Sequence, residues 1–144
     1  RALAHAVDRG VEVSILIGVG EYWMQDAVAK SFYRRLLKKG VKLYEYRKTQ
    51  LHAKVAVIDD DWATIGSSNV DGISLFINHE ANVVVHDNAF AKDLRTYIEA
   101  ALAESVEIRL DDFATRPWYK LWFYDVAFFI YRGLMRIMTL GDYT

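Results

Sequence analysis

Hydrophobic and polar positions in the first third of the chain repeat with the periods of helices and strands. The pattern predicts a helix, a strand, a helix and a second strand, at residues 2–9, 11–17, 25–39 and 41–46. Gly10 and Gly40 follow the two helices, as glycine commonly does, and the second helix carries Val28, Phe32 and Leu36 on one face. Strand, helix and strand in this order form a crossover unit, so we expect the two strands to be parallel.

The middle of the chain has the pattern of a hairpin followed by a further strand and a helix. The expected elements are strands at 52–58 and 62–68 joined by a turn at 59–61, a strand at 81–86, and a helix at 88–103. Asn88 is the expected N-cap of that helix. Its apolar positions are expected to face inward, and they are Phe90, Leu94, Tyr97, Ile98, Ala101 and Leu102.

Residues 117–140 are rich in aromatic side chains and predict a helix with one narrow polar stripe. On a helical wheel the stripe consists of Asp125, Arg132, Arg136 and Thr139. Its charges make the segment too interrupted for an ordinary membrane span but suit a helix that lies in the membrane interface. The side chains expected at the acyl boundary are Trp118, Trp122, Phe128, Phe129, Leu134 and Ile137. The alternative is a helix packed on a partner domain.

The composition is that of a folded domain with segregated charges. The chain has 144 residues, of which 53% are hydrophobic and 26% charged, so it can bury a sizeable core in one domain. The net charge of −1 argues against a global attraction to nucleic acid. Residues 30–48 nevertheless carry eight Lys and Arg residues against one acid, Glu45. The lack of cysteine excludes a disulfide, a thiolate metal site and a cysteine nucleophile.

An imidazole and an ammonium group stand near the start of the strand predicted at 52–58. Side chains alternate across a strand, so His52 and Lys54 are expected on one face. Burial of an ammonium group is costly without an anion, and a phosphate would supply one. An imidazole beside that phosphate could attack phosphorus or move a proton. The return strand ends in small residues with hydroxyl and amide groups suited to phosphate oxygens: Gly66, Ser67, Ser68 and Asn69.

These residues form a spaced pattern, H-x-K, four residues, D, six residues, then G-S-x-N. The pattern is carried by His52, Lys54, Asp59, Gly66, Ser67 and Asn69, and it resembles the motif of the phospholipase D superfamily. Downstream, "NVDGISLFINHE" places Asn69, Asp71, Ser74, Asn78 and Glu80 in an arrangement similar to that of bacterial cardiolipin synthases. The likeness covers about residues 1–103.

The resemblance implies a fold and a chemistry. The fold would be α/β, a phospholipase D-like mixed sheet flanked by helices, with a C-terminal amphipathic helix. The division would be a catalytic half-domain at 1–110 and an aromatic helical tail at 111–144. In this family two motifs meet in one active site, one His forms a phosphohistidine intermediate, and the other acts as general acid and base. The reaction needs no metal or other cofactor.

The same resemblance implies a role for each matching residue. His52 would be the nucleophile or the general acid/base, with the second role favoured because this motif would be the second of two. Lys54 and Asp59 would be catalytic together with His52, although the motif Asp more often supports the site than takes part directly. Lys54, Ser67 and Asn69 would hold phosphoryl oxygens, and Gly66 would support the site. Glu80 would orient a motif His, although a solvated carboxylate at a strand edge is the simpler alternative.

The chain holds one such motif, so the pattern favours the C-terminal half of a longer enzyme. Arg1 has no Met before it and no signal peptide precedes it, which fits a fragment. We expect a cardiolipin synthase-like phosphatidyltransferase that acts on phosphatidylglycerol or a similar phospholipid at the cytoplasmic side of the bacterial inner membrane, as a peripheral protein. Its partner would be a missing N-terminal half or a second identical chain. The alternatives are a homodimeric phosphodiesterase or nuclease of the superfamily, and a non-catalytic membrane-binding module.

Overall fold

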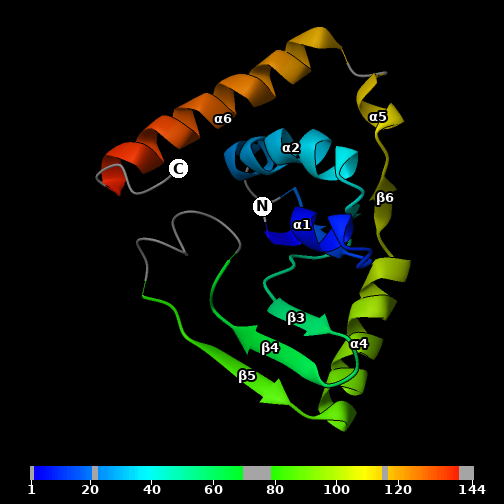
Figure 1. The fold of residues 1–144 in the computed structure, drawn as a ribbon. Helices are drawn as coiled ribbons and strands as arrows, with labels where there is room; N and C mark the ends of the chain where they lie inside the picture. The colour runs from blue at the N-terminus through cyan, green and yellow to red at the C-terminus, as the bar shows by residue number, and fades with distance from the viewer. Residues whose placement is uncertain (1, 21–22, 70–78, 115–116, 140–144) are drawn as a thin grey trace. The chain divides into compact units, whose positions relative to one another are not determined.

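The computed structural model describes residues 2–20, 23–69, 79–114 and 117–139 (Figure 1). The chain divides into two compact units. The first consists of Arg1–Leu51 and Glu104–Arg132, and the second of His52–Ala103 and Gly133–Thr144. Each unit is thus made of two separate stretches of the chain, which sequence patterns alone did not predict.

The first unit is built on a mixed sheet of three strands. Its strands are β1 (Ser14–Gly18), β2 (Lys42–Tyr46) and β6 (Val106–Ile108), in the order β1-β2-β6. β1 and β2 are parallel with Ser14 opposite Lys42, which confirms the predicted crossover. β6 is antiparallel to β2 and was not predicted.

Two N-terminal helices belong to this unit, α1 (Ala2–Asp8) and α2 (Trp23–Lys38). Its core is small and lies between α2 and the sheet. The buried side chains are Tyr33, Val41, Leu43 and Ile108, with Val7, Val13, Ile15, Ile17 and Leu36 packed around them. Val41 and Leu43 lie on one face of β2 because side chains alternate along a strand. The same alternation carries Glu45 into the buried face, where its side chain is 1% exposed.

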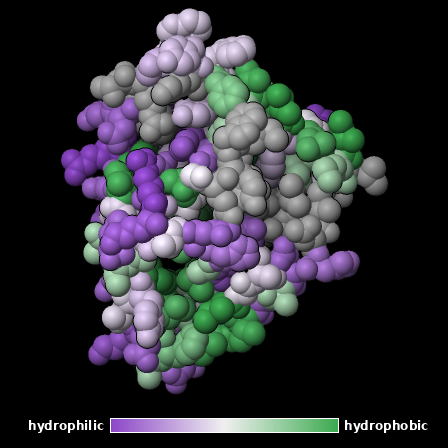
Figure 2. Space-filling model, turned by 180° about the vertical axis from the view of Figure 1, so that it is seen from behind, coloured by the Kyte–Doolittle hydropathy of each residue, from purple (hydrophilic) through white to green (hydrophobic). Residues whose placement is uncertain are grey.

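The second unit is built on an antiparallel sheet covered by one helix. Its strands are β3 (Lys54–Ile58), β4 (Trp62–Gly66) and β5 (Asn82–His86), in sequence order, and α4 (Asn88–Ala103) packs against all three. The predicted hairpin is confirmed. Apolar side chains also remain on the surface of this unit, among them Val83 and Val84. Hydrophobic (green) residues gather in the lower part of the view in Figure 2.

Two details of α4 differ from the sequence prediction. The N-cap is Asp87 rather than Asn88, because the Asp87 carboxylate accepts a hydrogen bond from the Phe90 amide at 2.8 Å. Tyr97, expected to face inward, is 76% exposed. The inward face of α4 is instead marked by Ala91, which is fully buried.

The C-terminal part of the chain contains α5 (Asp111–Ala114) and α6 (Trp118–Met138). α6 confirms the predicted helix, and no helix in the described ranges is long and apolar enough to cross a membrane. Phe128 was expected at the acyl boundary, and that prediction is wrong. Its ring packs edge-on against Phe32 of α2 with centroids 5.2 Å apart, and the Arg35 guanidinium lies 5.1 Å from the Phe128 ring centre.

Candidate active site

The motif lysine is the first residue of β3, and the motif histidine lies just before the strand. Lys54 is half-buried and His52 is exposed in irregular backbone. The Lys54 ammonium donates a hydrogen bond to the main-chain carbonyl of His52 at 2.8 Å. β3 therefore begins two residues later than predicted, and strand alternation does not fix the direction of the His52 side chain. The two residues are tied to each other through the backbone.

The glycine of the motif lies directly across the sheet from this lysine. Lys54 pairs with Gly66 between β3 and β4, and Gly66 pairs with Asn82 between β4 and β5. Residues paired across antiparallel strands point to the same face, so Lys54 and Asn82 flank Gly66 on one face. A side chain at Gly66 would collide with this neighbour, because an added Cβ would lie 1.8 Å from the Asn82 carboxamide oxygen and 2.6 Å from the Ala81 carbonyl oxygen.

The serine after the glycine is held by the segment that precedes β5. The Ser67 hydroxyl donates to the Glu80 carboxylate at 2.5 Å and accepts from the Ala81 amide at 3.0 Å. The Ser67 amide donates to the Ala81 carbonyl at 3.0 Å. These bonds fix the loop that follows β4. Glu80 thus acts on the loop of this motif, a contact that the sequence did not predict.

A second polar pair supports the same loop. The Asn82 carboxamide donates to the Ser68 hydroxyl at 2.6 Å. Sequence reasoning did not select Asn82. A signal was available, because the alternation of residues 81–86 places a polar side chain at the start of an otherwise valine-rich strand.

Asp59 lies at the other end of β3. It follows Ile58 in the turn of the hairpin and has a positive φ of 50°, and its carbonyl accepts a hydrogen bond from the Arg95 side chain. Five residues of extended strand separate Asp59 from Lys54 by about 16 Å. The structure does not bring these two motif residues together in this unit, so the contact of Asp59 here is with α4.

The remaining predicted residues follow β4. Asn69 is exposed at the end of the described segment. Asp71, Ser74 and Asn78 lie outside the described residues. Across the described ranges there is no group of three or more His, Asp or Glu side chains that could hold a metal ion.

The arrangement can bind an anion at one edge of the second unit's sheet. Lys54 supplies a positive charge, and the Ser68 hydroxyl accepts from Asn82 and keeps its own proton to donate. The Ser67 proton is donated to Glu80 in this structure, and the Asn82 carboxamide fills the space beside Gly66. Small donors and an ammonium group of this kind suit the oxygens of a phosphoryl group. His52 is exposed two residues before Lys54, and its imidazole can reach solvent and ligands.

Comparison with known proteins places these residues in context. A family model described as "Cardiolipin synthase, PLD-like domain" matches residues 1–102. Cardiolipin synthase B of Escherichia coli (strain K12) is 40% identical over 123 residues, which are 83% of this chain and 30% of that protein. Minor cardiolipin synthase ClsB of Bacillus subtilis (strain 168) is 34% identical over 116 residues, 80% of this chain and 29% of that protein.

A solved structure shares the fold. It is the crystal structure of a phospholipase D family member, Nuc from Salmonella typhimurium, with a TM-score of 0.66 and 24% sequence identity. The match covers 75% of this chain and 71% of that one. The predicted α/β class of the phospholipase D type is thereby confirmed, with the described strands divided between two small sheets.

Proposed function

This chain belongs to the family of cardiolipin synthases with a phospholipase D-like domain, and we propose that it is the part of a phosphatidyltransferase that carries one of two catalytic motifs. The enzyme transfers a phosphatidyl group from one phospholipid to a hydroxyl of phosphatidylglycerol. The observation that carries the proposal is the row Lys54–Gly66–Asn82, with Ser67 held beside it and His52 exposed just before it.

In the proposed reaction a histidine nitrogen attacks phosphorus, and the P–O bond to the leaving alcohol breaks. The second histidine donates a proton to that alcohol. The same histidine then takes a proton from the acceptor hydroxyl, whose oxygen attacks phosphorus and breaks the P–N bond. His52 serves as the general acid and base in this scheme. Lys54 and Asn69 bind the phosphoryl oxygens, where negative charge is concentrated throughout the reaction. Ser67 joins them when its hydroxyl turns from the Glu80 carboxylate to the phosphoryl group.

The supporting residues have separate tasks in this proposal. Gly66 leaves room for the Asn82 side chain that holds Ser68, and Glu80 fixes Ser67 and orients a motif histidine. Asp59 stabilises the hairpin that carries the motif, through its turn and its bond from Arg95.

The chain spans 30% of the length of the E. coli relative and 29% of the Bacillus relative. We therefore assign the second motif to a part of the protein outside this chain. The catalytic half-domain covers residues 1–110, and residues 111–144 form a helical tail. A homodimer of one-motif chains, acting as a phosphodiesterase or nuclease, is the alternative. A second H-x-K motif in the complete natural sequence supports the synthase, whereas its absence, with a dimer in analytical ultracentrifugation, supports the homodimer.

α6 attaches the enzyme to the cytoplasmic face of the bacterial inner membrane as a peripheral protein. Its exposed face carries large apolar side chains, including Phe129, Ile130 and Ile137, which are 69%, 67% and 75% exposed. Asp125, Arg132 and Arg136 are also exposed and border that face. Such a helix suits the interface, where apolar side chains enter the acyl boundary and arginines reach lipid phosphates.

The catalytic assignment is tested by His52→Ala in the full-length enzyme, with His5→Ala in α1 as the matched control. We expect His52→Ala to reduce cardiolipin formation by about 10²–10⁴-fold or more, as measured by mass spectrometry. The melting temperature should be unchanged. The control should keep near-normal turnover. Near-normal turnover by a folded His52→Ala enzyme would overturn the proposed function.

A further inference from the structure

Two neighbouring pockets of the first unit share one pair of charged side chains on α2. A polar pocket of about 320 Å³ is lined by Val19, Gly20, Asp26, Lys30 and Arg47. An aromatic pocket of about 560 Å³ is lined by Asp26, Ala27, Lys30, Tyr119, Trp122, Phe123 and Tyr124. Asp26 and Lys30 line both, so the two pockets form one site with a polar end and an aromatic end.

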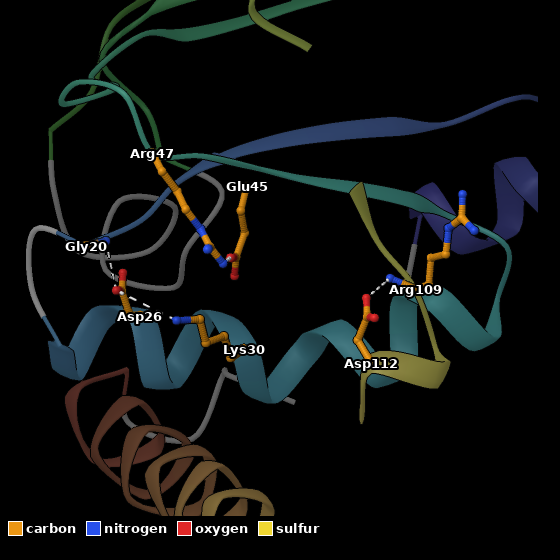
Figure 3. Close-up of polar contacts among 7 residues, drawn as sticks. All are labelled: Gly20, Asp26, Lys30, Glu45, Arg47, Arg109 and Asp112. Carbon is orange, nitrogen blue, oxygen red and sulfur yellow. Dashed lines mark hydrogen bonds and ion pairs between the residues drawn. The ribbon is translucent and has the colours of Figure 1, made fainter. Parts of the chain in front are cut away.

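The polar end forms where β1 and β2 finish. These strands are parallel, and Gly18 is paired with Tyr46 at their carboxyl ends, the edge at which α/β proteins commonly bind ligands. The chain then turns through Gly20, which has a positive φ of 99°. The Gly20 amide donates to the Asp26 carboxylate at 2.9 Å (Figure 3). This bond holds the loop against the first turn of α2.

Arg47 is positioned by a buried carboxylate. Glu45 is 1% exposed, and its Oε2 atom accepts a hydrogen bond from the Arg47 guanidinium. Its Oε1 atom has no hydrogen-bond partner within the described part of the chain. Figure 3 shows Glu45 and Arg47 reaching from the end of β2 toward Asp26 and Lys30 on α2. A buried carboxylate needs a cation, so Glu45 fixes where the guanidinium lies.

Two side chains that line this site, Lys30 and Arg47, keep N–H groups that can bind a ligand. The Lys30 ammonium is 3.9 Å from the Asp26 carboxylate, the outer limit of an ion pair. Arg47 uses one of its nitrogen atoms for Glu45, and its side chain is 58% exposed, so the other N–H groups remain for a ligand. Each cation is balanced by one carboxylate, Lys30 by Asp26 and Arg47 by Glu45. The described lining therefore suits a phosphate group through the N–H groups that Lys30 and Arg47 still have free for its oxygens, rather than through a net positive charge.

The aromatic end suits an apolar chain. Trp122 and Tyr119 of α6 are 63% and 54% exposed, although they border a pocket. Aromatic side chains with a polar tip are favoured where an apolar region meets water, as at the level of lipid head groups. A soluble phosphate ester would fill the polar end alone and leave these rings in water.

We propose that this site holds one phospholipid molecule, with its phosphate between Lys30 and Arg47 and its glycerol backbone and upper acyl chain against Tyr119 and Trp122. Glu45 is a positioning residue, because it acts through Arg47. The choice of a phospholipid rests on the proposed function. The site itself rests on the two shared pockets and the buried Glu45.

The test measures lipid binding separately from transfer. Full-length protein that carries His52→Ala, so that lipid is not consumed, is titrated by calorimetry with short-chain phosphatidylglycerol below its micelle concentration. Loss of one charge-assisted contact should weaken binding about tenfold or more in Lys30→Gln and in Arg47→Gln. Lys38→Gln and Arg34→Gln remove the same charges from exposed positions of α2 and should change Kd less than twofold. Trp122→Ala should weaken binding about tenfold, whereas Phe129→Ala, on α6 but outside the pocket, should not.

Two results would overturn the proposal. The first is equal affinity of Lys30→Gln and Lys38→Gln in proteins with matching circular dichroism. The second is binding of glycerol 3-phosphate as tight as that of the short-chain lipid, since that would mark a site for a free phosphate ester. If Arg47→Gln unfolds because Glu45 loses its partner, the double variant Glu45→Gln/Arg47→Gln replaces it. Failure of the proposed function gives a different result, which is full transfer by His52→Ala with the lipid site unchanged.

Discussion

The hydroxyl of Ser67 and the carboxylate of Glu80 are 2.5 Å apart, although 13 residues separate them in the chain. This bond closes the segment between β4 and β5 and fixes the loop on which the proposed phosphate-binding residues stand. It also gives Glu80 a contact that a solvated carboxylate at a strand edge would lack. A substitution at Glu80 can distinguish its effect on the position of Ser67 from the effect of its negative charge.

Glu80→Gln keeps a hydrogen-bond acceptor for Ser67 and removes the negative charge. We expect the free energy of unfolding to stay within about 0.5 kcal/mol of the parent, because the loop contact survives. If the charge supports a motif histidine, as proposed, transfer should fall at least tenfold. Urea unfolding and kcat/KM measure the two effects. A normal kcat/KM would mean that Glu80 only holds the loop through Ser67.

Gly66→Ala should be strongly destabilising. The added Cβ would overlap the Asn82 side chain, which can move, and would lie 2.6 Å from the Ala81 carbonyl oxygen, a backbone atom directly before β5. Forced overpacking of this kind commonly costs about 1–3 kcal/mol.

The matched control for this substitution is Gly133→Ala in α6, where an added Cβ meets nothing within 4 Å. That change should stabilise the protein by up to about 1 kcal/mol, because alanine favours a helix over glycine. Thermal unfolding of the two variants measures the contrast. Equal melting temperatures would mean that the strands separate freely at Gly66.

Most of the fold could be predicted because its signals are local. The β-branched runs and the glycines after the helices define β1, α2 and β2, and the apolar runs on either side of the 59–61 turn define the hairpin of β3 and β4. β6 has three residues, Val106–Ile108, and exists because it pairs with β2 more than 60 residues earlier. No local period marks so short a strand. Asp87 and Asn88 are both good caps, so only the bond from Phe90 decides between them.

The candidate sites were predictable to different degrees. The motif residues follow from spacing, but the hydrogen bonds of Ser67 and Asn82 depend on how β5 pairs with β4. Glu45 could have been found, because it alternates with Val41 and Leu43 on the buried face of β2. Residues 30–48 hold eight Lys and Arg residues against one acid, yet in the structure Lys30 pairs with Asp26 and Lys39 with Asp8. Partners from other elements decide what each charge does.

In the ion pair of Glu12 and Lys42, each side chain shifts the pKa of the other. Their side chains are 2.7 Å apart, and the hydrogen bond with Lys42 lowers the pKa of Glu12 below its ordinary value of 4.5, while the bond with Glu12 raises the pKa of Lys42 above 10.5. The stabilising effect of the pair is present between these two values. It is lost as pH falls through the lowered pKa of Glu12 or rises through the raised pKa of Lys42.

Carboxyl chemical shifts followed by NMR measure the Glu12 midpoint directly. Lys42→Gln should return it to its ordinary range. Lys48→Gln, which removes a lysine that pairs with Glu104 instead, should leave it unchanged. If Lys42→Gln leaves the Glu12 titration midpoint unchanged, the two side chains do not pair in solution.

Membrane attachment through α6 is best tested on its exposed face rather than by removing the helix. Phe128 packs against Phe32 and Met135 is fully buried, so a truncation before Pro117 would remove core contacts together with any membrane contact. Phe129, Ile130 and Ile137 are exposed apolar residues, and each contributes on the order of 1.5–3 kcal/mol when it enters an apolar phase. The triple substitution of these residues to serine should reduce binding to vesicles of phosphatidylglycerol and phosphatidylethanolamine at least tenfold.

The control, Val83→Ser with Val84→Ser, removes exposed apolar side chains from β5 and should bind as the parent does. Equal vesicle binding by the triple variant and the parent, both folded by circular dichroism, would contradict an interfacial α6 and would favour a partner domain on that face.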